Sequence, residues 1–121
     1  MAIAHRNTQT ASLAANGTAL SVAKPTGLAD GAVVVIHAVN AGATASPSTV
    51  PTGFTLVKSH GIGFSTGLSV YIKVISSASG EPATYDFVWG ASARHLLVAT
   101  AYSGVDNTTP QDAAATGQNN T

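Results

Sequence analysis

The stretch that decides the fold is Ala32-Val33-Val34-Val35-Ile36-His37-Ala38-Val39, a β-branched run that is nearly apolar on both faces. Branching at Cβ favours extended backbone, and a short apolar run bounded by turn residues is typical of a strand inside a sheet. Asp30-Gly31 stands directly before the run and marks a turn. The run therefore predicts a central β-strand.

Residues 68–74 show a second kind of strand pattern, because their polarity alternates. Every second position is aliphatic (Leu68, Val70, Ile72 and Val74), and the positions between hold Ser69, Tyr71 and Lys73. A period of two indicates that one face of a strand is buried and the other is wet. We therefore expect the aliphatic set to face the core and the Ser-Tyr-Lys set to face solvent.

The rest of the chain carries further strand signals and no convincing helical period. Strands are expected at residues 54–58, 84–89 and 94–102, and Asn16-Gly17 predicts a hairpin because both residues tolerate positive φ. The glycine-rich residues 61–67 indicate a hairpin or bulged connection. Together these patterns predict a single antiparallel all-β sandwich, jelly-roll-like, with about seven or eight strands.

A chain of 121 residues has material for one two-layer core. We expect the sandwich to span residues 11–105. The polar residues 1–10 are expected to form an N-terminal arm, and residues 106–121 a C-terminal arm or the start of a linker, because such segments cannot form a core alone.

Charge is unusually scarce. The chain has five Lys or Arg and five Asp or Glu residues, and its formal net charge is zero. Ordinary soluble domains carry about a quarter charged residues. A surface with so little charge repels other proteins weakly and tends to associate, which favours a subunit of a large assembly.

The charge distribution also bears on possible partners. The five cationic residues are scattered (Arg6, Lys24, Lys58, Lys73 and Arg94), whereas binding to a nucleic acid backbone requires a cluster. No apolar run approaches membrane length, and the N-terminus lacks the pattern of a signal peptide. We expect neither a nucleic acid nor a membrane partner.

No motif for catalysis or cofactor binding stands out. Cysteine is absent, there is no Gly-x-Ser-x-Gly elbow, and no two carboxylates stand at helical spacing. Residues 61–67 fail the dinucleotide pattern because position 66 is Thr, and they lack the Gly-Lys ending of a P-loop. We therefore expect no enzyme activity and no cofactor, although a triad assembled in space stays open as a third hypothesis.

The four histidines, His5, His37, His60 and His95, stand far apart and show no metal-ligand spacing. His37 is expected at a core or strand-edge position, His60 in an exposed loop, and His95 facing solvent or a neighbouring subunit. No metal site is expected from them.

Aromatic side chains offer candidate contact residues. Outward aromatics on a Ser/Thr-rich sheet are typical of sugar-binding surfaces, whereas aromatics in strands also serve as core or cross-strand partners. The candidates for partner or glycan contact are Trp89, Tyr102, Tyr71 and His95.

Five short stretches follow one another in a distinctive order: residues 24–31 (KPTGLADG), 51–57 (PTGFTLV), 70–74 (VYIKV), 81–87 (EPATYDF) and 101–106 (AYSGVD). This order resembles a β-sandwich module found in structural proteins of tailed bacteriophages and in some large bacterial surface proteins. The similarity spans about residues 20–112. Phe54 stands where such modules usually have tryptophan, and the chain ends where they often continue, so either a partner supplies further strands or the polypeptide is longer.

The resemblance implies a virion protein, such as a capsid decoration, head-fibre or tail-appendage module, that contacts other virion proteins and copies of itself. It carries no catalytic residues. The alternative is a tail-associated or surface adhesin module that binds carbohydrate on a cell surface.

Overall fold

The computed structural model describes residues 2–41, 46–62 and 66–112. It contains one 3-10 turn, η1 (Ala78–Gly80), and six strands: β1 (Ala4–Ser12), β2 (Gly17–Ala23), β3 (Val33–Ala41), β4 (Thr55–Ile62), β5 (Thr66–Val74) and β6 (Thr84–Ser103). No helix among these residues is long and apolar enough to cross a membrane.

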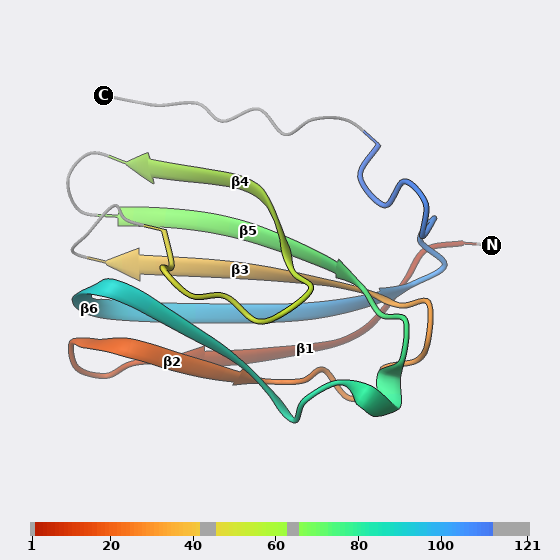
Figure 1. The fold of residues 1–121 in the computed structure, drawn as a ribbon, viewed down its shortest axis with the longest axis horizontal. Coiled ribbons are helices and arrows are strands. Elements are labelled where there is room, and N and C mark those ends of the chain that lie inside the picture. Colours follow the sequence, from red (N-terminus) through yellow and green to blue (C-terminus); the bar gives the residue numbers. More distant parts are fainter. Residues whose placement is uncertain (1, 42–45, 63–65, 113–121) are drawn as a thin grey trace.

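Five strands form the main layer in the order β1-β6-β3-β5-β4, and every neighbouring pair is antiparallel (Figure 1). Strand β3 pairs with β5 on one side and with β6 on the other, from Val33 to Ala41. The prediction of a central strand is confirmed, because a β-branched run is best accommodated where both of its edges are hydrogen-bonded.

Strand β6 joins the two layers. Its second half pairs with β1 and β3, and its first half pairs with β2 in a second layer that crosses over the main layer in Figure 1. Burial alternates along β6 except at Gly90, Ala91 and Ser92, which are all exposed where the strand passes between layers. The strands expected at 84–89 and 94–102 are thus one, which leaves six strands among the described residues.

The hydrophobic core lies between these layers. Val34, Ile36 and Ala38 of β3 belong to one buried cluster with Tyr85 and Phe87 from the first half of β6. A loop completes the second layer, since Thr49 and Val88 exchange two backbone hydrogen bonds of 3.1 Å. The two-layer, all-β antiparallel class predicted from the sequence is confirmed.

The N-terminal residues form a strand and not an arm. Strand β1 pairs with β6 from Ala4 opposite Ser103 to Ser12 opposite Leu96. The expectation that residues 1–10 form an arm was therefore wrong. Polar side chains can line this edge strand, because Asn7 and Gln9 are only partly exposed and satisfy each other through a side-chain hydrogen bond of 2.9 Å.

The segment around Asn16-Gly17 is not a hairpin turn. Strands β1 and β2 each pair with β6 and not with one another, so the connection carries the chain from the main layer to the second layer. Gly17 has no positive φ, which a type I′ turn would require.

Two further segments are described only in part. Strands β4 and β5 pair as an antiparallel hairpin with Gly61 opposite Gly67, as expected, although residues 63–65 at its tip lie outside the described residues. After β6, residues 106–112 have no regular structure, and residues 113–121 of the expected C-terminal arm lie outside the described residues.

The alternation in β5 is confirmed, but the assignment of its faces is reversed. Ser69 and Tyr71 are buried, at 2% and 4% exposure, whereas Leu68, Val70 and Ile72 are partly exposed on the opposite face of the main layer. The second layer covers the Ser-Tyr-Lys face, where the tyrosine ring packs against Phe87 at a centroid distance of 5.7 Å. The large ring of Tyr71 fills the space between the layers, and this packing outweighs the lower hydrophobicity of tyrosine compared with the aliphatic residues of β5.

Candidate functional site

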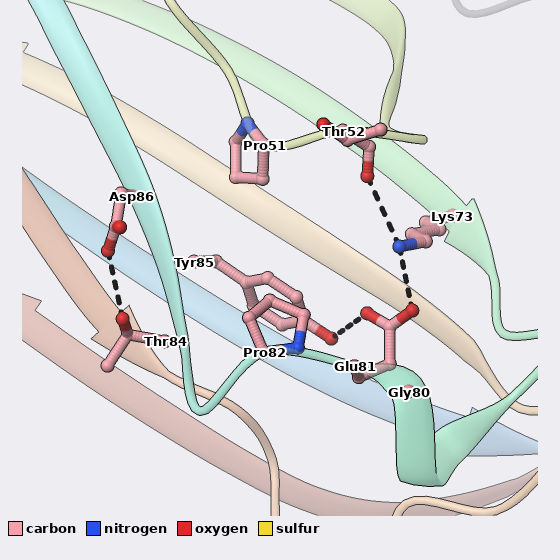
Figure 2. Close-up of a pocket in the computed structure, with 9 residues that line it drawn as sticks. All are labelled: Pro51, Thr52, Lys73, Gly80, Glu81, Pro82, Thr84, Tyr85 and Asp86. Atoms are coloured by element: carbon pink, nitrogen blue, oxygen red, sulfur yellow. Dashed lines mark hydrogen bonds and ion pairs between the residues drawn. The ribbon is translucent and has the colours of Figure 1, made fainter.

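A polar pocket opens at one end of the interlayer space, with a volume of about 420 Å³. Figure 2 shows its lining, which comes from the loop before β4, from the end of β5, and from the segment that runs from η1 into β6. The lining residues are Pro51, Thr52, Lys73, Gly80, Glu81, Pro82, Thr84, Tyr85 and Asp86.

A largely buried ion pair lies in this pocket. Lys73 Nζ is 2.7 Å from Glu81 Oε1, and Lys73 also donates to the backbone carbonyl of Thr52 at 3.2 Å. The second Glu81 oxygen accepts a hydrogen bond from the hydroxyl of Tyr85 at 2.9 Å (Figure 2). These groups bond to one another and join three segments of the chain, so they act as a clasp on this end of the fold.

The environment of Tyr85 favours its neutral form. Burial raises the pKa of this tyrosine far above its ordinary value, and the hydrogen bond to Glu81 and its negative charge raise the pKa further. Burial likewise raises the pKa of Tyr71, against a smaller lowering by a hydrogen bond with Ser69. Both phenols therefore resist ionisation in the folded protein.

We expect the protein to lose stability as the pH rises above about 10, where tyrosines in the unfolded chain ionise. The pKa of each tyrosine is higher in the folded than in the unfolded protein, so its contribution to stability is fully present below the unfolded pKa. Above that pKa the free energy of unfolding falls by up to about 1.4 kcal/mol per pH unit for each tyrosine. Tyr85→Phe should flatten part of this decline. Denaturant unfolding from neutral to alkaline pH measures both slopes, and equal slopes would contradict the assignment.

Asp86 forms the exposed rim of the pocket. Hydrogen bonds from Ser21 and from Thr84, the latter 2.9 Å long, hold the pKa of its carboxyl below the ordinary value. Asp86 is therefore a charged acceptor at the mouth, beside the hydroxyl of Thr84.

Three of the four candidate contact residues lie in the core. Trp89, Tyr71 and His95 are only 2–4% exposed, so they cannot contact a ligand from solvent. The Trp89 and His95 rings stack at 3.8 Å with an interplanar angle of 9°, and His95 Nε2 lies 2.9 Å from the Gly17 carbonyl oxygen. The expectation that His95 faces outward was wrong, because His95 lies on the buried side of β6 and its neighbour Leu96 lies on the exposed side.

Tyr102 remains the accessible candidate. It lies on the side of the main layer turned away from the second layer, partly exposed, with its ring 6.0 Å from that of His5. The structure therefore separates Tyr102 from the other three candidates.

The side of the main layer on which Tyr102 lies has no cover from any described element, and we call it the open face. Strand register aligns its central side chains in three rows across β6, β3 and β5: Thr100-Val35-Ile72, Val98-His37-Val70 and Leu96-Val39-Leu68. Seven of these nine side chains are aliphatic, and all nine are partly or fully exposed. The sequence predicts neither the pocket nor this patch, because the aliphatic alternation of residues 68–74 by itself indicates a core-facing side.

Polar residues border the open face on both edge strands. Strand β1 contributes Thr8, Thr10 and Ser12, and Thr8 shares a 3.2 Å hydrogen bond with Thr100. Strand β4 contributes Lys58 and His60. An apolar centre within a polar rim is the usual anatomy of a protein–protein interface.

The histidines do not meet. His37 is exposed in the middle row of the open face, and His60 lies in β4 and not in a loop. Among the described residues, no group of three or more His, Asp or Glu side chains could hold a metal ion.

Comparisons with models of protein families, with curated proteins and with solved structures find no match to this chain. The fold defines an all-β antiparallel sandwich with one open aliphatic face.

Proposed function

We propose that this chain is a non-enzymatic structural protein of a phage particle, a capsid decoration or head-fibre module that works through contacts with other proteins. The open face is the observation that carries the proposal. Soluble monomers rarely expose a large contiguous apolar patch at the centre of a sheet, and such patches mark interaction surfaces. The low charge and the similarity to phage modules support the setting in a particle.

The clasp in the pocket serves the stability of the fold. Its ion pair and its tyrosine hydroxyl are satisfied by one another, so Lys73, Glu81 and Tyr85 hold the fold together at that end. Both charges of this ion pair therefore contribute to stability.

Mass spectrometry of purified particles from the host that carries this gene tests the proposal. We expect the chain to be present, with a high copy number on the capsid or a low copy number on the tail. Val70→Lys, in the centre of the open face, should reduce incorporation. Val88→Lys, on the outer side of the second layer, should leave it unchanged. Absence of the chain from particles would overturn the proposal.

A carbohydrate-binding adhesin module is the second candidate, and the pocket is the observation that favours it. Asp86 and Thr84 present an acceptor and a hydroxyl at the mouth of a 420 Å³ cavity, which are groups that bind sugar hydroxyls. A glycan array should show binding that Asp86→Asn weakens about tenfold, because a neutral amide oxygen accepts a sugar hydroxyl more weakly than a carboxylate does. Binding to no glycan would retire this candidate.

A further inference from the structure

We infer that the open face is the interface of a homodimer, in which two copies of this chain pack sheet against sheet. The inference rests on the proposed function, since it names the protein that covers this face. It is carried by the outward side chains of the main layer, by the area of that layer and by the distribution of charge over it.

The outer side of the second layer shows what a solvated face of this protein looks like. There, Ser21, Thr84 and Asp86 are exposed, and Val88 is the one large aliphatic side chain at the outward positions of β2 and the first half of β6. The open face differs at the equivalent outward positions, because Val35, Val39, Leu68, Val70, Ile72 and Val98 take the place of such polar groups. The contrast within one molecule indicates that the open face is adapted to contact protein.

The area of the open face suffices for a stable pair. Five strands of about nine residues cover about 24 Å by 30 Å, or about 700 Å² per copy. Two such faces bury about 1,400 Å² in total, within the range of specific interfaces. Aliphatic sheet faces pack in this way at about 10 Å in ordinary β-sandwiches, so a second copy supplies a surface of matching shape.

The charges also favour a second copy. The three rows of the open face and their polar border contain no carboxylate, and cations lie at the margins, with Lys58 on edge strand β4 and Arg94 at the end of the β6–β3 pairing. A partner rich in acidic groups would have to bury them against an aliphatic centre. Two copies of a chain with zero net charge meet without long-range repulsion.

A twofold axis parallel to β3 satisfies these constraints. It places the β4 rim of each copy over the β1 rim of the other, so that Lys58 faces Thr10 and not another lysine. In the same row, Val70 of one copy faces Val98 of the other. Edge-to-edge pairing is disfavoured, because β1 and β4 each contain a register shift and carry Arg6 and Lys58.

Sedimentation velocity over a broad dilution series tests the inference on the purified full chain. We expect a dimer for the wild type and a rise in Kd of at least about a hundredfold for Val70→Lys, because each copy then buries an unpaired charge. Leu96→Lys should raise the Kd in the same way. Because Leu96 is 38% exposed, a lysine at this position should disturb the fold of the monomer less. Val88→Lys, also at 38%, is the matched control and should remain dimeric.

A mixture provides a positive readout. Val70→Lys mixed with Val98→Asp should form a heterodimer, because the lysine of one copy then faces the aspartate of the other. Each variant alone should sediment as a monomer. Circular dichroism establishes that the variants are folded. A wild-type monomer at all concentrations, or a Val70→Lys dimer as tight as the wild type, would overturn the inference.

The two proposals fail separately. A monomeric wild type whose Val70→Lys variant is lost from particles would mean that the open face binds a different particle protein, and the proposed function would stand. A dimer that never enters particles would remove the proposed function and leave the homodimer in place.

Discussion

Phe87→Ala is expected to lower the free energy of unfolding by about 3–5 kcal/mol, the cost of removing a large buried ring and leaving a cavity. Phe87 is fully buried between the layers, and its ring lies 5.7 Å from that of Tyr71 and 6.1 Å from that of Trp89. It is therefore a contact between the second layer and the main layer. Because domains of this size are stable by about 5–15 kcal/mol, the variant should lose a large share of its stability.

Denaturant unfolding followed by Trp89 emission measures this loss, since Trp89 is the only tryptophan of the chain and is buried. Protein concentration must be held constant, because dimerisation adds to the apparent stability. Val88→Ala, the outward neighbour on the same strand, is the matched control and should cost under about 1 kcal/mol. A similarly small loss for Phe87→Ala would mean that the two layers are not packed through this ring.

Glu81→Ala should lower the free energy of unfolding by about 2–4 kcal/mol. It leaves the Lys73 ammonium, whose side chain is 18% exposed, without its anion, and it leaves the Tyr85 hydroxyl without an acceptor. The residual exposure of Lys73 keeps the loss below that of a fully buried pair.

Removing both charges distinguishes the ion pair from the packing of its side chains. Lys73→Met combined with Glu81→Ala should be more stable than Glu81→Ala alone, because no unpaired buried charge remains. Glu81→Gln should fall between the wild type and Glu81→Ala, since its amide oxygen still accepts from Tyr85. Lys73→Met alone completes the comparison. If the double variant lost as much free energy of unfolding as the two single variants together, the two charges would not be coupled.

The strand content of this fold was predictable because it is encoded locally. A β-branched run in β3 and a two-residue period in β5 depend on backbone preference and on nearest neighbours along the strand. The reversed faces of β5 could not be predicted, because a period of two states that two faces differ and does not state which one meets the second layer. Both sets contain large side chains, and the second layer covers the set with Tyr71.

The pocket and its clasp had no local signal. Lys73 and Glu81 are separated by η1 and come together only because β5 ends beside the start of β6. The burial of Trp89 and His95 was equally hidden, since their stacking requires β6 to pass from one layer to the other between them. A single tryptophan in a strand is compatible with core and surface positions alike.

The amino-acid sequence by itself determined that this protein is an antiparallel all-β domain with very little charge, because strand propensity, polarity period and composition are properties of short segments. Only the tertiary structure decided which side of the sheet is covered, that one long strand serves both layers, and that an aliphatic face is left open. Those features depend on contacts between segments far apart in the chain, where the volume and burial of whole side chains outweigh local polarity.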